Sequence, residues 1–196
     1  MGQDILLYSN ILLWVFQVFM VFLIILIFRQ FGTVYLAKSD AIERDGIPIG
    51  NFMGKLEGLS YFSNELITNE TFMGKPTLLG FISPGCAPCK ELIPEWNRAY
   101  QKYNNEINFV LIGVGDKESF SKVKEIKKLK GELLLDPDRN NLQKCKVRVT
   151  PFAFILDNEG EVKGKGLCND MGHINGLISS LKSNVEIIEN IGEVAH

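Results

Sequence analysis

The sequence predicts an α/β domain built as a three-layer sandwich, with helices on both faces of a sheet, behind an N-terminal transmembrane helix. Two observations lead to this architecture. The first is a stretch without charged residues, Ile5 to Phe28. The second is the alternation of apolar runs with helical patterns from Thr77 onward, in the order β-α-β-α-β-α-β-β-α. A length of 196 residues suits one globular domain and an appendage.

The N-terminal stretch has the length of a membrane span. As a helix, Ile5 to Phe28 would extend about 36 Å, which exceeds a hydrocarbon core of about 30 Å. The run is longer than the apolar region of a signal peptide, no Lys or Arg precedes it, and no small-residue cleavage site follows it. A buried core helix is disfavoured because the run lacks a polar face. We therefore predict an uncleaved anchor over residues 1–30, in contact with membrane lipid.

A juxtamembrane linker is expected at 31–48, and the folded domain at 49–196. Two features of the sequence predict opposite orientations of the anchor in the membrane. Arg29, Lys38 and Arg44 follow the span, and the positive-inside rule would leave this side in the cytoplasm. The cysteine chemistry described below favours the opposite, extracytoplasmic side.

The elements of the domain follow from its periodicity. Residues 51–62 indicate an irregular hairpin, because their apolar residues fall in three short groups separated by Gly54 and Gly58. Helical spacing predicts helices over 89–106, 117–130 and 170–182, a brief helix within 137–146, and a further one over 183–192. Apolar runs predict strands over 77–82, 107–115, 132–136, 151–157 and 162–167, the last two forming a hairpin.

The motif C-A-P-C at 86–89 carries the chemistry. Cys86 is expected at the N-terminus of the helix that follows, where unpaired N–H groups and the helix dipole stabilise a thiolate. Its pKa should therefore fall below the free value of about 8.5. Cys89 lies one helical turn further on, within reach of a disulfide. Cys86 would attack a sulfur of the client and Cys89 would resolve the mixed disulfide, while Pro88 stiffens the first turn.

Metal binding is the main alternative for a bare C-x-x-C. Structural zinc needs four ligands, and the chain has no second C-x-x-C, only single residues: Cys145, Cys168, His173 and His196. A redox dithiol is therefore favoured, and no bound cofactor is expected. The net charge of −2 does not indicate a positively charged surface for binding nucleic acid.

Together these features resemble the thioredoxin superfamily. The resemblance runs through "KPTLLGFISPGCAPCKELIPEW", "VRVTPFAFILDNEGEV" and the strand–helix order between them. In that family the proline at the position of Pro151 is cis and faces the dithiol, and the residue before it offers backbone hydrogen bonds to a client chain. The resemblance thus implies a thioredoxin-like three-layer sandwich with Thr150 and Pro151 as substrate-binding residues.

A closer likeness is to the membrane-tethered TlpA-type redoxins, and among such proteins to the MauD family of methylamine-utilisation accessory proteins. The motifs that carry it are "FRQFG", "SPGCAPCKELIP" and "GKGLCNDMGHINGL". This resemblance implies a role in forming disulfides in a secreted, disulfide-rich dehydrogenase subunit. The chain departs from thioredoxin at Gly80, where thioredoxin has a buried acid, and at Gly85, where a tryptophan often stands. Glu91 is only a weak candidate for proton handling.

We therefore predict a membrane-tethered thiol–disulfide oxidoreductase that acts on client protein thiols or disulfides outside the cytoplasm. A membrane redox partner would recycle the dithiol, and the direction of electron flow stays open. A thiol peroxidase is one alternative, but only Ser83 matches the expected motif and Leu79 stands where a proline is expected. A copper chaperone using Cys86, Cys89 and His173 is another. We expect Cys145 and Cys168 to be buried and structural, with a disulfide between them left open.

Overall fold

The computed structural model describes residues 8–27 and 45–181, and the chain divides into two units, Met1–Glu43 and Arg44–His196. In the first unit, Tyr8–Ile27 forms a helix of 20 residues with a mean hydropathy of 2.7. No residue in the most apolar part of this helix is buried. The helix has the length and composition of a membrane anchor or of a signal sequence.

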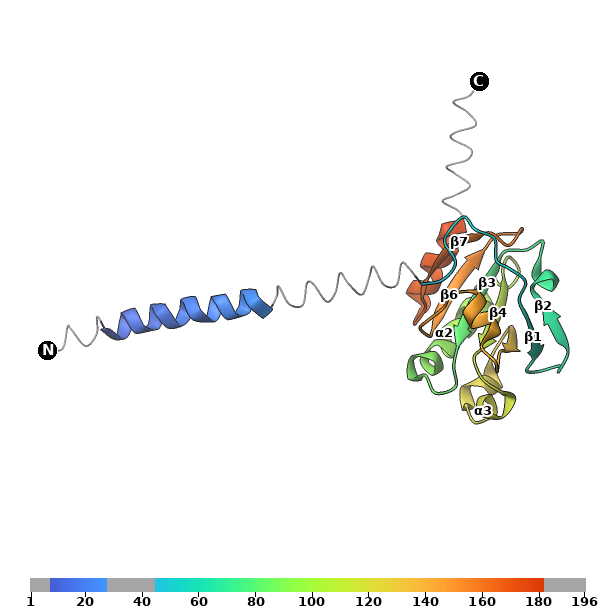
Figure 1. Ribbon diagram of the computed structural model, residues 1–196, viewed down its shortest axis with the longest axis horizontal. Helices are drawn as coiled ribbons and strands as arrows, with labels where there is room; N and C mark the ends of the chain where they lie inside the picture. Colours follow the sequence, from blue (N-terminus) through green and yellow to red (C-terminus); the bar gives the residue numbers. More distant parts are fainter. Residues whose placement is uncertain (1–7, 28–44, 182–196) are drawn as a thin grey trace, which may run out of the picture. The chain divides into compact units, whose positions relative to one another are not determined.

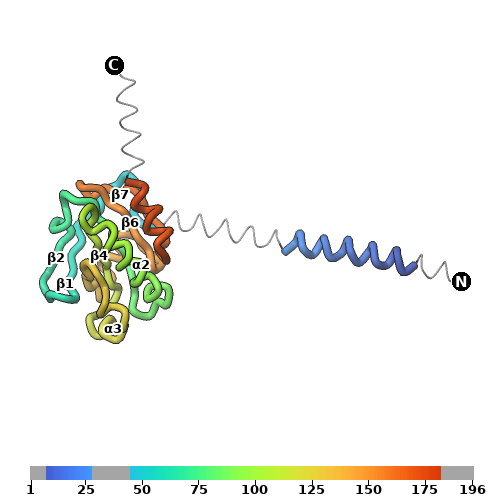
Figure 2. Tube along the Cα trace, turned by 180° about the vertical axis from the view of Figure 1, so that it is seen from behind, coloured from blue at the N-terminus to red at the C-terminus, as the bar shows by residue number. Residues whose placement is uncertain are grey.

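The second unit is built on a seven-stranded mixed sheet with the order β2-β1-β5-β4-β3-β6-β7. Strands β3, β4 and β5 are parallel, and all the other pairs are antiparallel. In both views β1 and β2 lie at one edge of the sheet and β7 at the other (Figures 1 and 2). The strands are β1 (Glu57–Ser60), β2 (Leu66–Thr68), β3 (Thr77–Ile82), β4 (Asn108–Gly113), β5 (Glu132–Leu135), β6 (Phe152–Leu156) and β7 (Val162–Leu167).

The main core lies on the face of the sheet that the longest helix of this unit covers. That helix is α2 (Ala87–Tyr103), and it packs beside α3 (Lys117–Ser121), the 3-10 helix η2 (Lys124–Lys128) and helix 171–181. Alternate residues of the strands point to this face because side chains along a strand alternate between the two sides. The buried aromatic side chain on this face of α2 is Trp96, which is fully buried and stacks edge-on against Phe109.

The opposite face of the sheet carries a second set of buried side chains, among them Phe81, Phe152 and Phe154. The chain from residue 45 crosses part of this face. Gly46, with a φ of 79°, lies so close to Phe154 that an added Cβ would come within 2.8 Å of its ring. The remaining helices are the 3-10 helix η1 (Asn69–Phe72) and α4 (Asn140–Lys144). Covering segments on both sides of the sheet make the three layers that the sequence predicts.

The sequence-based elements are mostly confirmed, with three differences. Residues 117–130 do not form one amphipathic helix but two short ones, α3 and η2, although Phe120, Val123 and Ile126 are buried as expected. A 3-10 turn places residues three apart on one side, so a broken helix satisfies the same apolar pattern. The predicted hairpin at 51–62 instead pairs β1 with β2, and β1 also joins the main sheet through β5.

The third difference concerns the segment predicted as a linker, 31–48. Asp45 is buried, and Gly46 donates a backbone hydrogen bond to Lys146, so the chain already packs on the globular unit at residue 45. The last helix is seen over 171–181. The helix predicted at 183–192 lies outside the described residues.

Candidate active site

Cys86 is the N-cap residue of α2, as its place in the motif predicts. Its backbone is extended, and its own N–H closes a turn by donating to the carbonyl oxygen of Ser83 at 3.3 Å. The Sγ of Cys86 accepts a hydrogen bond from the N–H of Cys89 at 3.2 Å. Pro88 lies in the first turn without an N–H, and this turn contains no acidic side chain. These dipoles favour negative charge on the Cys86 sulfur.

Cys86 and Cys89 form a disulfide, and their Cα atoms are 5.3 Å apart. This separation lies inside the range of about 4.4–6.8 Å that a disulfide needs. The two sulfurs differ in access to solvent, because Cys89 is buried and Cys86 is only half-buried. An incoming sulfur therefore reaches Cys86 first.

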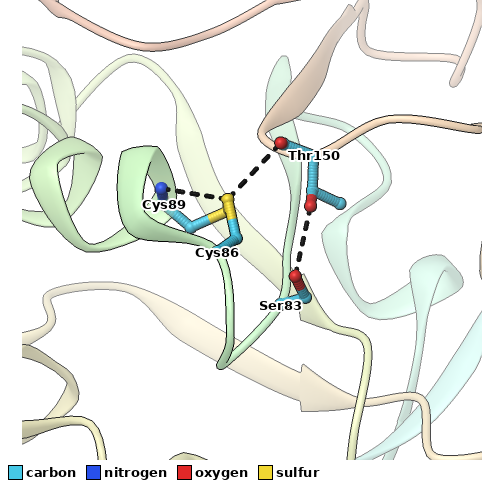
Figure 3. Close-up of a disulfide and its surroundings, with 4 residues drawn as sticks. All are labelled: Ser83, Cys86, Cys89 and Thr150. Carbon is cyan, nitrogen blue, oxygen red and sulfur yellow. Dashed lines mark hydrogen bonds between the residues drawn. A yellow bond between two sulfur atoms is a disulfide. The ribbon is translucent and has the colours of Figure 1, made fainter.

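Thr150 and Pro151 lie beside this pair, joined by a cis peptide bond. Sheet register explains the approach, because β6 runs antiparallel to β3 and Phe152 pairs with Phe81. The start of β6 therefore meets the end of β3, which leads to Cys86. The carbonyl oxygen of Thr150 lies 3.4 Å from the Sγ of Cys86 (Figure 3). An S–H···O hydrogen bond fits this distance in the reduced thiol, whereas a disulfide sulfur has no proton to donate.

The hydroxyl groups of Ser83 and Thr150 are also hydrogen-bonded, with 3.2 Å between their oxygens (Figure 3). The sequence indicates Ser83 only as part of a peroxidase motif and does not pair it with Thr150. The two residues are 67 positions apart, and nothing in the sequence around Ser83 indicates this contact.

Gly80 occupies the position where thioredoxin carries a buried acid, and neighbouring side chains fill the space there. An added Cβ would lie 2.6 Å from Leu111 and 3.2 Å from the ring of Trp96. Glu91 is exposed and Leu92 is buried, so neither supplies a buried carboxylate near Cys89. Gly85 is exposed with open space around it, which leaves the approach to Cys86 unobstructed.

Cys145 and Cys168 are free thiols and are completely buried, as expected. Burial is the main cause that raises the pKa of each thiol to about 12, with smaller contributions from the charges of Asp136 and Asp170. The Sγ of Cys145 contacts the Sδ of Met53 at 3.5 Å, away from the α2 face. Cys168 packs in the cluster on the α2 face, and its N–H donates to the carbonyl of Pro151. Both thiols are therefore poor nucleophiles in the folded chain.

His173 pairs with Asp170 rather than with the dithiol. Its Nδ1 lies 3.0 Å from the Oδ2 of Asp170, and its backbone N–H donates to the other carboxylate oxygen. Within 8–27 and 45–181, no three His, Cys, Asp or Glu side chains are grouped closely enough to hold a metal ion. The copper-chaperone alternative therefore finds no third ligand in the described part of the chain.

Residues 74–162 match the family model described as Thioredoxin-like. Together with the fold and the dithiol, this match shows a thioredoxin-like domain in the globular unit, and similar proteins are named thiol-disulfide oxidoreductases. Along nearly its whole length the chain is similar to the methylamine utilization protein MauD of Methylophilus methylotrophus. The two are 26% identical over 194 residues, which are 97% of this chain and 90% of the relative.

Two further proteins are similar to this chain, one in sequence and one in fold. The thiol-disulfide oxidoreductase YkuV of Bacillus subtilis is 27% identical over 118 residues, covering 57% of this chain and 80% of YkuV. The thioredoxin domain of a thiol-disulfide oxidoreductase from Bacteroides vulgatus superposes with a TM-score of 0.59 at 18% identity. That match covers 66% of this chain and 97% of the solved structure, and it supports the fold.

Proposed function

We propose that this chain is a membrane-anchored thiol–disulfide oxidoreductase that exchanges disulfides with protein clients outside the cytoplasm. Cys86 is its nucleophile and Cys89 its resolving cysteine. The observation that carries the proposal is the N-cap position of Cys86, in a disulfide with the more buried Cys89 and beside Thr150–cis-Pro151. The names of similar proteins, a thiol-disulfide oxidoreductase among them, support protein thiols or disulfides as substrates.

In the oxidising direction, a thiolate of the client attacks the Sγ of Cys86. A client–Cys86 bond forms as the Cys86–Cys89 bond breaks, and the electron pair leaves on the sulfur of Cys89. A second client thiolate then attacks the client sulfur of the mixed disulfide. This step closes the client disulfide and releases Cys86 as a thiolate, which the helix N-terminus and the N–H of Cys89 stabilise.

The reverse sequence reduces a client disulfide, and the redox partner that recharges the dithiol sets the net direction. The similarity to MauD favours disulfide formation in a specific client. Thr150 lies where an extended client segment next to the attacked sulfur would meet its backbone, as the thioredoxin resemblance implies. Hydrogen bonds to that backbone would hold the segment while the sulfurs exchange.

The N-terminal helix is the proposed anchor, in contact with lipid through Ile5–Phe28. Its described part, Tyr8–Ile27, carries no charged residue and is exposed along its whole length. An extracytoplasmic domain is favoured because stable disulfide chemistry belongs to oxidising compartments. We propose that this chemistry outweighs the opposing signal of Arg29, Lys38 and Arg44 after the span.

Trapping of the client tests the proposal. In the native cell, a Cys89→Ser variant should accumulate a mixed disulfide with its client on Cys86, visible as a band that disappears on reduction. The matched control, Cys86→Ser, should trap far less because the more accessible of the two sulfurs is missing. No trapped species with Cys89→Ser, together with slow alkylation of Cys86 at neutral pH, would contradict the proposal.

Fractionation of the same cells tests the anchor and its orientation. The chain should stay in the membrane fraction after alkaline carbonate washing. A membrane-impermeant maleimide should then label Cys86 in the reduced Cys89→Ser chain of intact cells or spheroplasts. Labelling only after the membrane is permeabilised would place the dithiol in the cytoplasm and overturn the localisation.

A further inference from the structure

We propose that Ser83 is a positioning residue for client binding, because its hydroxyl holds the Thr150–Pro151 loop in register with the dithiol turn. This inference rests on the proposed function and deepens it. Ser83 lies directly after β3, and its two polar groups point to the two parts of the site. Its carbonyl oxygen receives the N–H of Cys86 at 3.3 Å, and its hydroxyl meets the hydroxyl of Thr150 at 3.2 Å (Figure 3).

The loop that Ser83 contacts is also held by segments other than the dithiol turn, since Lys146 accepts the N–H of Gly46, Arg148 pairs with Asp45 and Pro151 accepts the N–H of Cys168. It connects α4 to β6 over residues 145–151, outside any helix or strand. Val149 is 40% exposed and Thr150 is half-buried, so this part of the loop faces solvent. Among the described side chains, the Ser83–Thr150 bond and the contact of Thr150 with the sulfur of Cys86 join the loop to the dithiol turn.

These two links behave differently during the reaction. The sulfur of Cys86 passes through disulfide, thiolate and mixed disulfide, so its contact with the carbonyl of Thr150 changes at each step. A thiolate repels that carbonyl, and a mixed disulfide has no proton to give it. The two hydroxyl groups do not change their chemistry in any of these states. Ser83 therefore provides the link that persists while a client is bound.

The consequence concerns protein clients and not small disulfides. A client chain that pairs with the backbone of Thr150 needs this backbone at a set distance from the Sγ of Cys86. A small aromatic disulfide makes no such backbone contact and needs only the sulfur. Loss of the Ser83 hydroxyl should therefore slow reaction with a peptide and leave reaction with a small disulfide nearly unchanged.

The test uses the full chain in detergent micelles, reduced and carrying Cys89→Ser, so that a single exchange step is observed. One substrate is a short cysteine peptide joined by a disulfide to thionitrobenzoate, and the other is the symmetrical aromatic disulfide dithiobis(nitrobenzoate). In both reactions the Cys86 thiolate attacks, a new disulfide to Cys86 forms, and thionitrobenzoate leaves as a coloured thiolate. The leaving group is therefore the same, and the attacked sulfur carries a peptide in one substrate and an aromatic ring in the other.

Ser83→Ala should slow the peptide reaction about fivefold, the factor that one neutral hydrogen bond supplies. Thr150→Val removes the other hydroxyl of the same bond and should cause a similar loss, and the double variant should be no slower than either. Thr150→Ser should recover most of the rate lost in Thr150→Val. Ser121→Ala, at an exposed serine of α3, is the matched control.

Four outcomes would overturn the inference: an unchanged peptide rate in Ser83→Ala, an equal loss with both substrates, multiplied losses in the double variant, or no recovery in Thr150→Ser. Failure of the proposed function looks different. In that case the chain with native Ser83 and Thr150 would react with the aromatic disulfide but not with the peptide.

Discussion

Gly80 offers a test of how the site is packed, because a single added methyl group has a measurable cost there. In Gly80→Ala the new Cβ would lie 2.6 Å from the Cδ2 of Leu111 and 3.2 Å from the ring of Trp96. Neither neighbour can move easily. Both are fully buried, and the Nε1 of Trp96 donates to the carbonyl of Lys130 at 3.2 Å. Overpacking of this kind lowers the free energy of unfolding by about 1–3 kcal/mol.

The assay is urea unfolding of the full chain in detergent, followed by tryptophan fluorescence. Gly80→Ala should lower the midpoint without changing the slope m, because the surface exposed on unfolding stays the same. Gly166→Ala is the matched control, since Gly166 also lies in a strand of this sheet but an added Cβ there meets nothing within 4 Å. Gly166→Ala should change the free energy of unfolding by no more than about 0.5 kcal/mol.

A second variant identifies Leu111 as the cause. Leu111→Ala alone should cost about 2–5 kcal/mol through the cavity it leaves. In the double variant the methyl group added by Gly80→Ala occupies part of that cavity, so the total loss should be at least about 1 kcal/mol smaller than additivity predicts. An unchanged midpoint for Gly80→Ala, or strict additivity, would refute this reasoning. Introducing the acid of thioredoxin, Gly80→Asp, should destabilise the fold further, because a buried unpaired carboxylate is added to the clash.

Two further predictions concern buried groups. Cys145 and Cys168 should resist alkylation at neutral pH unless the chain is unfolded. Burial raises the pKa of each thiol from 9.0 to about 12, so between these pH values the unfolded chain loses protons that the folded chain keeps. The free energy of unfolding should therefore fall between pH 9 and 12, by about 1.4 kcal/mol per pH unit for each thiol. A Cys145→Ala/Cys168→Ala chain should lose this slope, and an equally steep one would contradict the reasoning. Asp136 is buried and accepts the N–H groups of Asn141 and Leu142 at the start of α4. In urea unfolding, Asp136→Ala should lower the free energy of unfolding by about 1–3 kcal/mol. Asp136→Asn should lower it less, because the amide keeps one acceptor oxygen. An unchanged midpoint for Asp136→Ala would show that water replaces the carboxylate.

The dithiol and the central strands could be predicted because they depend on near neighbours in the chain. A spacing of three residues at the start of a helix brings Cys86 and Cys89 into disulfide range in any fold. Predominantly apolar runs such as 77–82 favour buried strands, and every residue of β3 is buried. The hairpin predicted at 51–62 contains β1 but not its partner β2, which is short and only partly buried. Burial alternates along β1, but its buried positions are Gly58 and Ser60 while Leu59 is exposed, so the residue types do not reveal the period.

The positions of Thr150 and Pro151 could be expected only through the thioredoxin resemblance, and the partner of Ser83 could not be expected at all. Their approach to Cys86 depends on the pairing of β6 with β3, two strands far apart in the chain, which is a property of the whole sheet. Local pattern carries no information about which strands pair.

By itself, the sequence determined the apolar helix, the paired thiols at a helix N-terminus and the main strands, since each follows from periodicity or from contacts within a few residues. Only the tertiary structure decided that Trp96 and Leu111 fill the space above Gly80, and that the hydroxyl of Ser83 meets Thr150. The physical reason is that these contacts join segments far apart in the chain, and packing of the complete sheet against α2 is what brings them together.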